Sequence, residues 1–140
     1  MADTPRRAIE LERVGEHRFR ATNERGGTLE FSSTAGPDFT PIELLLVALG
    51  GCTALDVEHI TGKRAEPAGF AVRAAGDKIR DADGNHLTNL TVTFRVEFPG
   101  GEAGDAARAV LPDAVRKSHE RLCTVTRTIE LGTPVQAVLS

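Results

Sequence analysis

Alternating polar and apolar positions predict strands in two parts of the chain. Residues 8–32 alternate around a turn at Arg25-Gly26-Gly27, a pattern typical of hairpins. Residues 70–81 and 87–98 predict two longer strands, with DADGN as the turn between them. In the second of these strands the apolar residues recur at every second position, so they share one face. These residues are Leu90, Val92, Phe94, Val96 and Phe98.

The stretch TPIELLLVALGGCTALDV predicts a buried helix. Thr40 is a suitable N-cap, Pro41 suits the first helical position, and Glu43 completes a capping box. We expect the helix to run to about Gly62. Its first half is apolar on nearly every side, which indicates burial on all faces. A monomer of this size surrounds such a helix with difficulty, so a partner subunit is one solution.

Residues 102–123 predict a second helix, which Pro112 is expected to kink or restart. The positions at helical spacing are Ala107, Val110, Leu111, Ala114, Val115, Ser118 and Leu122. The remaining segment predicts a short element, a turn at Gly132 and a final strand ending at Val138 and Leu139. The predicted order is β-β-β-α-β-β-α-β, which is an α+β fold.

Length and composition narrow the class of protein. The 140 residues suit a single domain spanning residues 1–140, with 40% hydrophobic and 26% charged residues and a net charge of −3. The absence of a basic stripe, and of Trp and Tyr, argues against a nucleic-acid partner. The N-terminus has no apolar core, which argues against a signal peptide. The apolar run over residues 44–55 is shorter than the roughly 18 residues of a membrane span, so we expect a cytoplasmic protein without a membrane partner.

Cys52 follows two glycines inside the first helix, where each glycine costs about 1 kcal/mol relative to alanine. A helix broken at Gly50-Gly51 exposes unpaired backbone N–H groups near Cys52, and these favour a reactive thiolate with a lowered pKa. The alternative is structural. The glycines then allow another helix to approach closely, and Cys52 is a small core residue.

Cys123, the second cysteine, follows the second helix. In a cytosolic chain two cysteines are more often thiols than a structural disulfide, and this pair permits one thiol to attack and the other to resolve. His119 lies four residues before Cys123 and is a candidate to activate it, or to bind a metal with Cys52 and His59. The alternative for His119 is a surface group that complements the C-terminus of the helix.

Charged residues are candidates for the same site. Glu43 has a structural role in the capping box. An arginine beside a thiolate stabilises it and can hold a hydroperoxide oxygen. Arg18, Arg20 and Arg25 lie on or between the first strands, where arginines are usually solvated. The residues alone do not choose among these three.

Two motifs together, TPIELLLVALGGCTALDV and HERLCTVTRTIELGTPV, resemble the OsmC/Ohr superfamily of osmotically induced and organic-hydroperoxide-resistance proteins. The family pattern is Pro-x-Glu-Leu-Leu-Leu-x-Ala-Leu-Gly-Gly-Cys-Thr on a central helix, with a second cysteine after a later helix. The resemblance extends from about Arg18 to the end of the chain. It implies an α+β, OsmC-like fold in which antiparallel sheets wrap long central helices in an intertwined homodimer, with active sites at the subunit interface.

The resemblance also implies roles for four residues. Cys52 is the peroxidatic thiol and Cys123 the resolving thiol, while Arg18 and Glu43 hold the thiolate and orient the substrate. Arg18 lies nearest the arginine position expected by counting back from GGTLEF. Glu43 lies one residue later than the glutamate of the peroxidase branches, where Ile42 stands here, and one residue rotates a helical side chain by about 100°. The sequence is therefore closer to the looser OsmC-like branch.

The predicted function is a thiol-dependent peroxidase that reduces organic hydroperoxides, or hydrogen peroxide, through the Cys52–Cys123 pair. Its expected partners are a second copy of the chain, a small hydroperoxide substrate and an external dithiol reductant such as a lipoylated protein. No cofactor and no metal is expected. The alternative is a non-catalytic dimer that binds a small apolar or thiol-reactive ligand in the interface cleft. A third hypothesis is a metal site formed by Cys52, Cys123 and His119.

Overall fold

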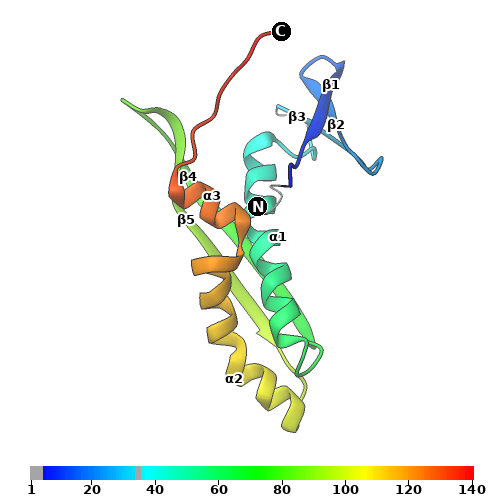
Figure 1. The fold of residues 1–140 in the computed structure, drawn as a ribbon, viewed down its shortest axis with the longest axis vertical. Coiled ribbons are helices and arrows are strands. Elements are labelled where there is room, and N and C mark those ends of the chain that lie inside the picture. Colours follow the sequence, from blue (N-terminus) through cyan, green and yellow to red (C-terminus); the bar gives the residue numbers. More distant parts are fainter. Residues whose placement is uncertain (1–4, 34–35) are drawn as a thin grey trace. The chain divides into compact units, whose positions relative to one another are not determined.

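The computed structural model describes residues 5–33 and 36–140. The first four residues of the N-terminal segment, and residues 34 and 35 of the loop expected after the first strands, lie outside the described part. The chain divides into two compact units, Met1–Leu45 and Leu46–Ser140, and each unit has its own architecture. Figure 1 shows the ribbon with its helices and strands labelled.

The first unit contains a three-stranded antiparallel sheet in the order β1-β2-β3. Its strands are β1 (Ile9–Gly15), β2 (Arg18–Asn23) and β3 (Thr28–Ser32). They confirm the strands predicted over residues 8–32. Gly26 lies in the predicted turn, where its φ of +89° favours glycine and its N–H donates to the Asn23 carbonyl at 3.1 Å. Phe19 pairs with Phe31 across β2 and β3, and their rings stack with centroids 6.3 Å apart.

Helix α1 (Pro41–Thr61) begins with the predicted capping box. The Thr40 N–H donates to Glu43 Oε1 at 2.9 Å, and the Glu43 N–H donates to Thr40 Oγ1 at 3.3 Å. By length and composition α1 is apolar enough to cross a membrane, with a mean hydropathy of 1.4 over its apolar stretch. Only 28% of that stretch is buried. Helix α1 therefore carries apolar side chains that the single chain leaves exposed, such as Val47 and Leu55, and its burial on all faces stays a prediction that requires a partner subunit.

The second unit contains a long antiparallel hairpin of β4 (Gly69–Asp81) and β5 (Gly84–Glu97). The predicted turn is present, and Gly84 in it has a φ of +98° that favours glycine. The predicted alternation in β5 is confirmed, because the apolar residues are half-buried while the threonines and the arginine between them are exposed. One face of this hairpin is thus the apolar face.

The two glycines of α1 have different surroundings, and the helix continues through both without a break. A Cβ atom at Gly50 would lie 3.2 Å from Ala74 Cβ and 3.6 Å from Val72 Cγ1, both on β4. A Cβ atom at Gly51 would meet nothing within 4 Å in the described part of the chain. Gly50 therefore permits close packing, as the structural interpretation proposed, but against a strand rather than another helix.

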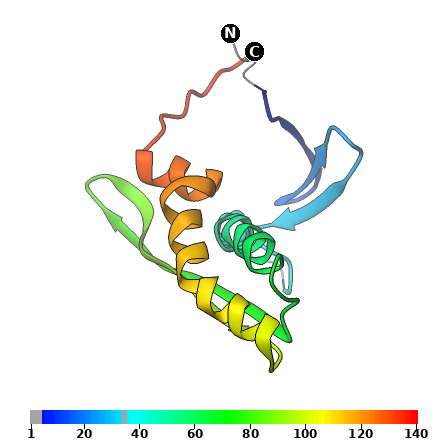
Figure 2. The same ribbon diagram turned by 60° about the horizontal axis from the view of Figure 1, so that its bottom comes forward.

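Three helical segments follow the hairpin: α2 (Glu102–Lys117), the π-helical turn η1 (Ser118–Leu122) and α3 (Thr124–Leu131). Pro112 lies inside α2, and the helix is not restarted there. The predicted second helix therefore ends at Lys117, because the backbone changes from α to π geometry at Ser118. Figure 2 shows α2 running beside the β4–β5 hairpin.

The final strand predicted to end at Val138 and Leu139 is wrong. Residues 133–140 form neither helix nor strand and are exposed, whereas residues 124–131 fold as α3. Gly132 ends α3 in the left-handed conformation, with a φ of +64°. A strand needs a neighbour for its N–H and C=O groups, and in the described part of this unit β4 and β5 pair only with each other. The observed order is β-β-β-α-β-β-α-α, with η1 between the last two helices, which confirms the α+β class with antiparallel sheets.

The packing of Gly50 against β4 predicts a specific cost for a larger side chain. We expect Gly50→Val to lower the free energy of unfolding by about 1–3 kcal/mol, because the new methyl groups overpack against Ala74 and Val72. Ala48→Val adds the same side chain at an exposed position of the same helix and should cost about 0.5 kcal/mol. Urea denaturation at one fixed protein concentration measures both. Equal losses in the two variants would contradict this account of Gly50.

Candidate active site

Two sulfur atoms meet at the N-terminus of α3. Cys52 lies on α1, and Cys123 is the N-cap residue of α3. Both cysteines are free, and they lie near enough to each other for Cys123 to raise the pKa of the Cys52 thiol. Cys123 is fully buried, whereas Cys52 is partly exposed. The fold thus brings together the two cysteines that the sequence predicted as a pair.

The first turn of α3 donates hydrogen bonds to Cys123 Sγ and places a further N–H near Cys52. The Thr126 N–H donates to Cys123 Sγ at 3.3 Å, and Thr126 Oγ1 donates to the same sulfur at 3.1 Å. The Val125 N–H lies near Cys52 and acts to lower the pKa of its thiol. Backbone N–H groups in a first turn have no partner within their own helix, so they are available to sulfur. Donors were expected near Cys52 from a break in α1, but α1 is continuous and a different helix supplies them.

Burial is the largest effect on the Cys52 thiol, and it raises the pKa of that thiol above its ordinary value. The Val125 N–H opposes this shift because it stabilises the thiolate. The hydrogen bond with Cys123, and the charges of Cys123 and Asp56, raise the Cys52 pKa further. The lowered pKa expected from a helix break is therefore not found. The surroundings of Cys52 in the second unit favour a neutral thiol.

A chain of three polar side chains connects α1 to η1 near Cys52. Ser118 Oγ donates to Asp56 Oδ2 at 2.8 Å. A hydroxyl has only one proton, so Thr53 Oγ1, which lies 2.6 Å from Ser118 Oγ, is the donor in that second contact. Ser118 is fully buried and Thr53 is 5% exposed, whereas Asp56 is half-buried, so the Thr53–Ser118 contact is the part shielded from water. We call these three residues the Thr53–Ser118–Asp56 chain.

The sequence interpretation did not select the Thr53–Ser118–Asp56 chain. One signal was available, because Asp56 follows Cys52 by four residues and therefore shares its face of α1. Ser118 was assigned only to the packed face of the second helix. Nothing local to Ser118 indicates that its hydroxyl meets α1, since that contact joins residues 62 positions apart.

A pocket of about 540 Å³ lies in the second unit, between α1, β5, α2 and α3. Its apolar lining residues are Leu49, Leu90, Val92, Phe94, Pro112, Val115 and Ile129. Thr53, which is next to Cys52, and Thr126, which contacts Cys123, also line it. The pocket therefore reaches side chains adjacent to both cysteines and offers mainly apolar walls to a bound molecule.

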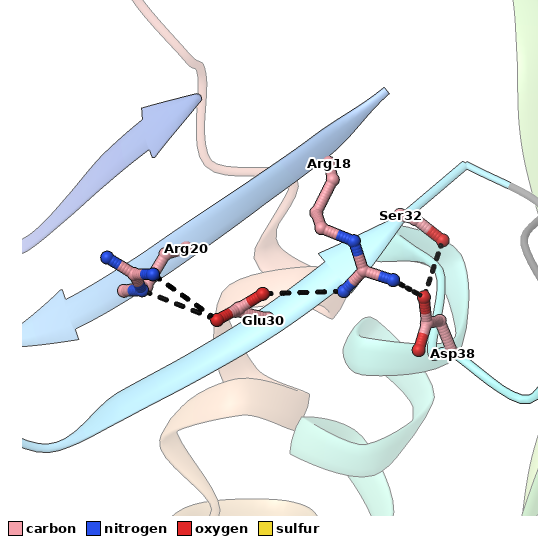
Figure 3. A network of polar contacts seen from close by, with 5 residues as sticks. All are labelled: Arg18, Arg20, Glu30, Ser32 and Asp38. Carbon is pink, nitrogen blue, oxygen red and sulfur yellow. Dashed lines mark hydrogen bonds and ion pairs between the residues drawn. The ribbon is translucent and has the colours of Figure 1, made fainter. Parts of the chain in front are cut away.

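Arg18 belongs to a charged network in the first unit, shown in Figure 3. Its Nη1 lies 3.4 Å from Glu30 Oε1, and its Nη2 pairs with Asp38 Oδ2. Ser32 Oγ donates to the same Asp38 oxygen at 3.3 Å. Arg20 contacts the other Glu30 oxygen at 3.4 Å. Two carboxylates thus orient the Arg18 guanidinium, and one of them is shared with Arg20.

The other predicted residues have partners of their own. Glu43 takes part in the capping box with Thr40. His119 Nε2 lies 3.8 Å from Glu130 Oε1, and the His119 side chain is 60% exposed. Among residues 5–33 and 36–140, no three His, Cys, Asp or Glu side chains gather as metal ligands. The hypothesis of a metal site with His119 is therefore wrong, because its ring faces a surface carboxylate instead of joining both cysteines.

The fold and the paired thiols define an α+β protein with antiparallel sheets and a two-cysteine site. The model of the family described as OsmC-like protein matches residues 34–138, which is more than half of the chain. The chain therefore belongs to the OsmC-like family.

One curated relative and two solved structures show what the chain is similar to. An uncharacterised protein of Mycobacterium tuberculosis is 28% identical over 127 residues, covering 89% of this chain and 90% of the relative. An OsmC-like protein of unknown function from Vibrio cholerae has a TM-score of 0.74 at 15% identity, covering 91% of this chain and 95% of that one. The organic hydroperoxide resistance protein OhrB of Bacillus subtilis has a TM-score of 0.58 at 14% identity, covering 86% and 89%.

The charge of Asp56 predicts a shift in the reactivity of Cys52. In a Cys123→Ser background, where Cys52 is the only cysteine, we expect Asp56→Asn to move the pH profile of iodoacetamide alkylation to lower pH. The reason is that Asp56 raises the Cys52 pKa and alkylation requires the thiolate. Glu58→Gln removes a charge from an exposed position of α1 and serves as the control. A profile that stays in place, or moves equally in both variants, contradicts the assignment.

Proposed function

We propose that this protein is a thiol-dependent peroxidase that reduces organic hydroperoxides through Cys52 and Cys123. The observation that carries the proposal is that Cys52 of α1 lies near Cys123 at the start of α3, close enough for Cys123 to raise the pKa of the Cys52 thiol. Neighbouring thiols need little movement to close a disulfide, as a two-cysteine peroxidase requires. Membership of a family whose fold includes a hydroperoxide resistance protein of Bacillus subtilis supports the same function.

In the proposed reaction the Cys52 thiolate attacks the terminal peroxide oxygen. An S–O bond forms and the O–O bond breaks, so the leaving alkoxide takes up a proton and departs as an alcohol. Cys52 is thereby oxidised to a sulfenic acid. The Cys123 thiol then attacks the Cys52 sulfur, which closes the disulfide and releases water. An external dithiol restores both thiols by exchange and is itself oxidised to a disulfide.

The pocket beside the cysteines supports an organic substrate over hydrogen peroxide. Seven apolar side chains line it, together with Thr53, which follows Cys52 in the sequence, and Thr126, which donates to Cys123. Burial of an alkyl or aryl group against such walls contributes about 25 cal/mol per Å² of apolar surface. Hydrogen peroxide has no apolar surface to bury, so this pocket provides no comparable gain for it.

Arg18 is the proposed cation for the Cys52 thiolate, and Glu43 is its proposed partner. The surroundings of Cys52 in the second unit raise its pKa, so formation of a thiolate calls for an added positive charge. Arg18 is about one-third exposed, and two carboxylates orient its guanidinium. The capping bond to Thr40 holds the Glu43 carboxylate at the start of α1.

The proposed assembly is an intertwined homodimer in which both units of residues 1–140 form one OsmC-like domain, acting in the cytoplasm. Uncovered apolar side chains support a partner of the same kind. On the first sheet Ile9 is 57% exposed and Leu29 48%, and on α1 Leu55 is 68% exposed. A second copy of the chain supplies apolar surface to cover these residues.

A second candidate function is a non-catalytic dimer that binds a small apolar or thiol-reactive ligand. Two observations favour it. The pocket has mainly apolar walls, and the Cys52 pKa is raised, which keeps the thiol neutral. Oxidation of the thiols by a hydroperoxide separates this function from the peroxidase.

We expect one equivalent of cumene hydroperoxide to remove both thiols of the wild-type chain, because Cys52 is oxidised and Cys123 then closes the disulfide. Cys52→Ser should abolish the loss. Cys123→Ser should leave a sulfenic acid at Cys52 that dimedone traps. Thiol titration and mass spectrometry measure these results. Thiols that survive millimolar hydroperoxide unchanged would exclude the peroxidase and favour the binding function.

The arginine assignment has a matched control within the same network. Arg18→Ala should slow the oxidation of Cys52 by at least about tenfold, which is the effect of losing 1.4 kcal/mol of thiolate or transition-state stabilisation. Arg20→Ala also removes an arginine from Glu30 but should leave the rate nearly unchanged. Stopped-flow kinetics with cumene hydroperoxide measures both. An equal effect of the two substitutions contradicts a specific role for Arg18.

The proposed dimer predicts a sedimenting mass of two chains at micromolar concentration. Leu55→Glu should shift the protein toward the monomer, because a charge at this exposed apolar position opposes burial against a partner. His59→Glu places the same charge on an exposed polar position of α1 and should leave the mass unchanged. Analytical ultracentrifugation measures both. A monomeric wild type would contradict the assembly.

A further inference from the structure

Ser118 contacts both cysteine-bearing segments, one through its side chain and the other through its main chain. Its hydroxyl bonds to Asp56 at 2.8 Å and to Thr53 at 2.6 Å, and both residues lie on α1 within four positions of Cys52. Its carbonyl accepts the Cys123 N–H at 2.9 Å. A single buried residue therefore connects the part of α1 that carries Cys52 to the backbone of Cys123.

The π-helical turn makes this connection direct. The bond from the Cys123 N–H to the Ser118 carbonyl spans five residues, which is the spacing of a π-helix rather than an α-helix. Cys123 then leaves helical geometry, with φ −74° and ψ 104°, and its sulfur accepts the Thr126 N–H. Ser118 is the first residue of η1, and its carbonyl bonds to the Cys123 N–H. A shift of Ser118 would therefore also shift Cys123 and its sulfur.

The hydrogen bonds of the Thr53–Ser118–Asp56 chain fix the first residue of η1 against α1. Ser118 is fully buried, and its hydroxyl acts once as donor and once as acceptor. Loss of this hydroxyl leaves a nearly buried Thr53 hydroxyl and a carboxylate without this partner, and such groups pay a desolvation cost. The arrangement that keeps all three groups bonded is therefore favoured over displaced positions of η1.

We propose that Ser118 is a positioning residue for the Cys52–Cys123 disulfide. It holds the start of η1 on α1 through Thr53 and Asp56, and so places the Cys123 sulfur for bond formation with Cys52. The inference rests on the proposed redox pairing of the cysteines, but not on a peroxide as the oxidant.

Equilibration with glutathione tests the role without peroxide. The Cys52 thiolate attacks glutathione disulfide and releases one glutathione, and Cys123 then attacks the Cys52 sulfur and releases the second. The ratio of closed to open chain, at known glutathione and glutathione disulfide, gives the effective concentration of one thiol at the other. We expect Ser118→Ala to lower this value about three- to tenfold, as loss of one buried hydrogen bond allows.

Thr61→Ala is the matched control for a structural effect. Thr61 lies on α1, the helix that carries Cys52. It is fully buried, and its hydroxyl donates to the Val57 carbonyl at 2.9 Å. Thr61→Ala should lower the free energy of unfolding of the reduced protein while leaving the effective concentration of the two thiols unchanged. Equal effective concentrations in wild type and Ser118→Ala, or equal losses in Ser118→Ala and Thr61→Ala, would overturn the positioning role.

Thr53→Val keeps the test available if Ser118→Ala does not fold, because it removes the hydroxyl that donates to Ser118 and preserves the side-chain shape. It should also lower the effective concentration, and an unchanged value would overturn the role. A wild type that closes the disulfide with glutathione but is not oxidised by hydroperoxide would contradict the proposed peroxidase alone. A wild type that closes no disulfide would contradict both the redox pairing and the role of Ser118.

Discussion

The hydrogen bonds from the first turn of α3 to sulfur are the interaction on which the candidate site depends. The start of a helix leaves backbone N–H groups without intrahelical partners, and these groups need acceptors when they are buried. Here the Thr126 N–H meets Cys123 Sγ, and the Val125 N–H meets Cys52. The start of α3 is therefore capped by the sulfur of Cys123 and also lies near the sulfur of Cys52 on α1.

Opposing electrostatic effects act on this pair. Burial, Cys123 and Asp56 favour the neutral Cys52 thiol, while the Val125 N–H favours the thiolate. Asp56 is not a free surface charge, because Ser118 donates to its carboxylate and Thr53 donates to Ser118. The Asp56 carboxylate, which disfavours the Cys52 thiolate, is thus also the acceptor of the Ser118 hydroxyl that joins η1 to α1. Under the proposed function, the thiolate form of Cys52 calls for a positive charge, and its proposed source is Arg18, which Glu30 and Asp38 orient.

Much of the fold was predictable because its signals are local. The alternation in β5 and the Thr40–Glu43 capping box depend on residues within a few positions of each other, and both are present. The final strand was wrongly predicted because pairing is not local. Residues 133–140 have alternating apolar side chains but no strand beside them in the described part of this unit. The glycine pair was explained only in part, since its sequence indicates small size but not that Gly50 meets Ala74 of β4.

Sequence patterns alone predicted the α+β class, the capped start of α1 and the two cysteines as candidates for one site. Those conclusions rest on periodicity, on capping chemistry and on two motifs read together. Only the tertiary structure decided what surrounds Cys52: donors from α3 instead of a broken α1, and a carboxylate anchored through Ser118. The physical reason is how far apart in the sequence the interacting groups lie. Helix capping acts over three or four residues, whereas burial and the pKa of a thiol depend on groups that folding brings together from distant parts of the chain.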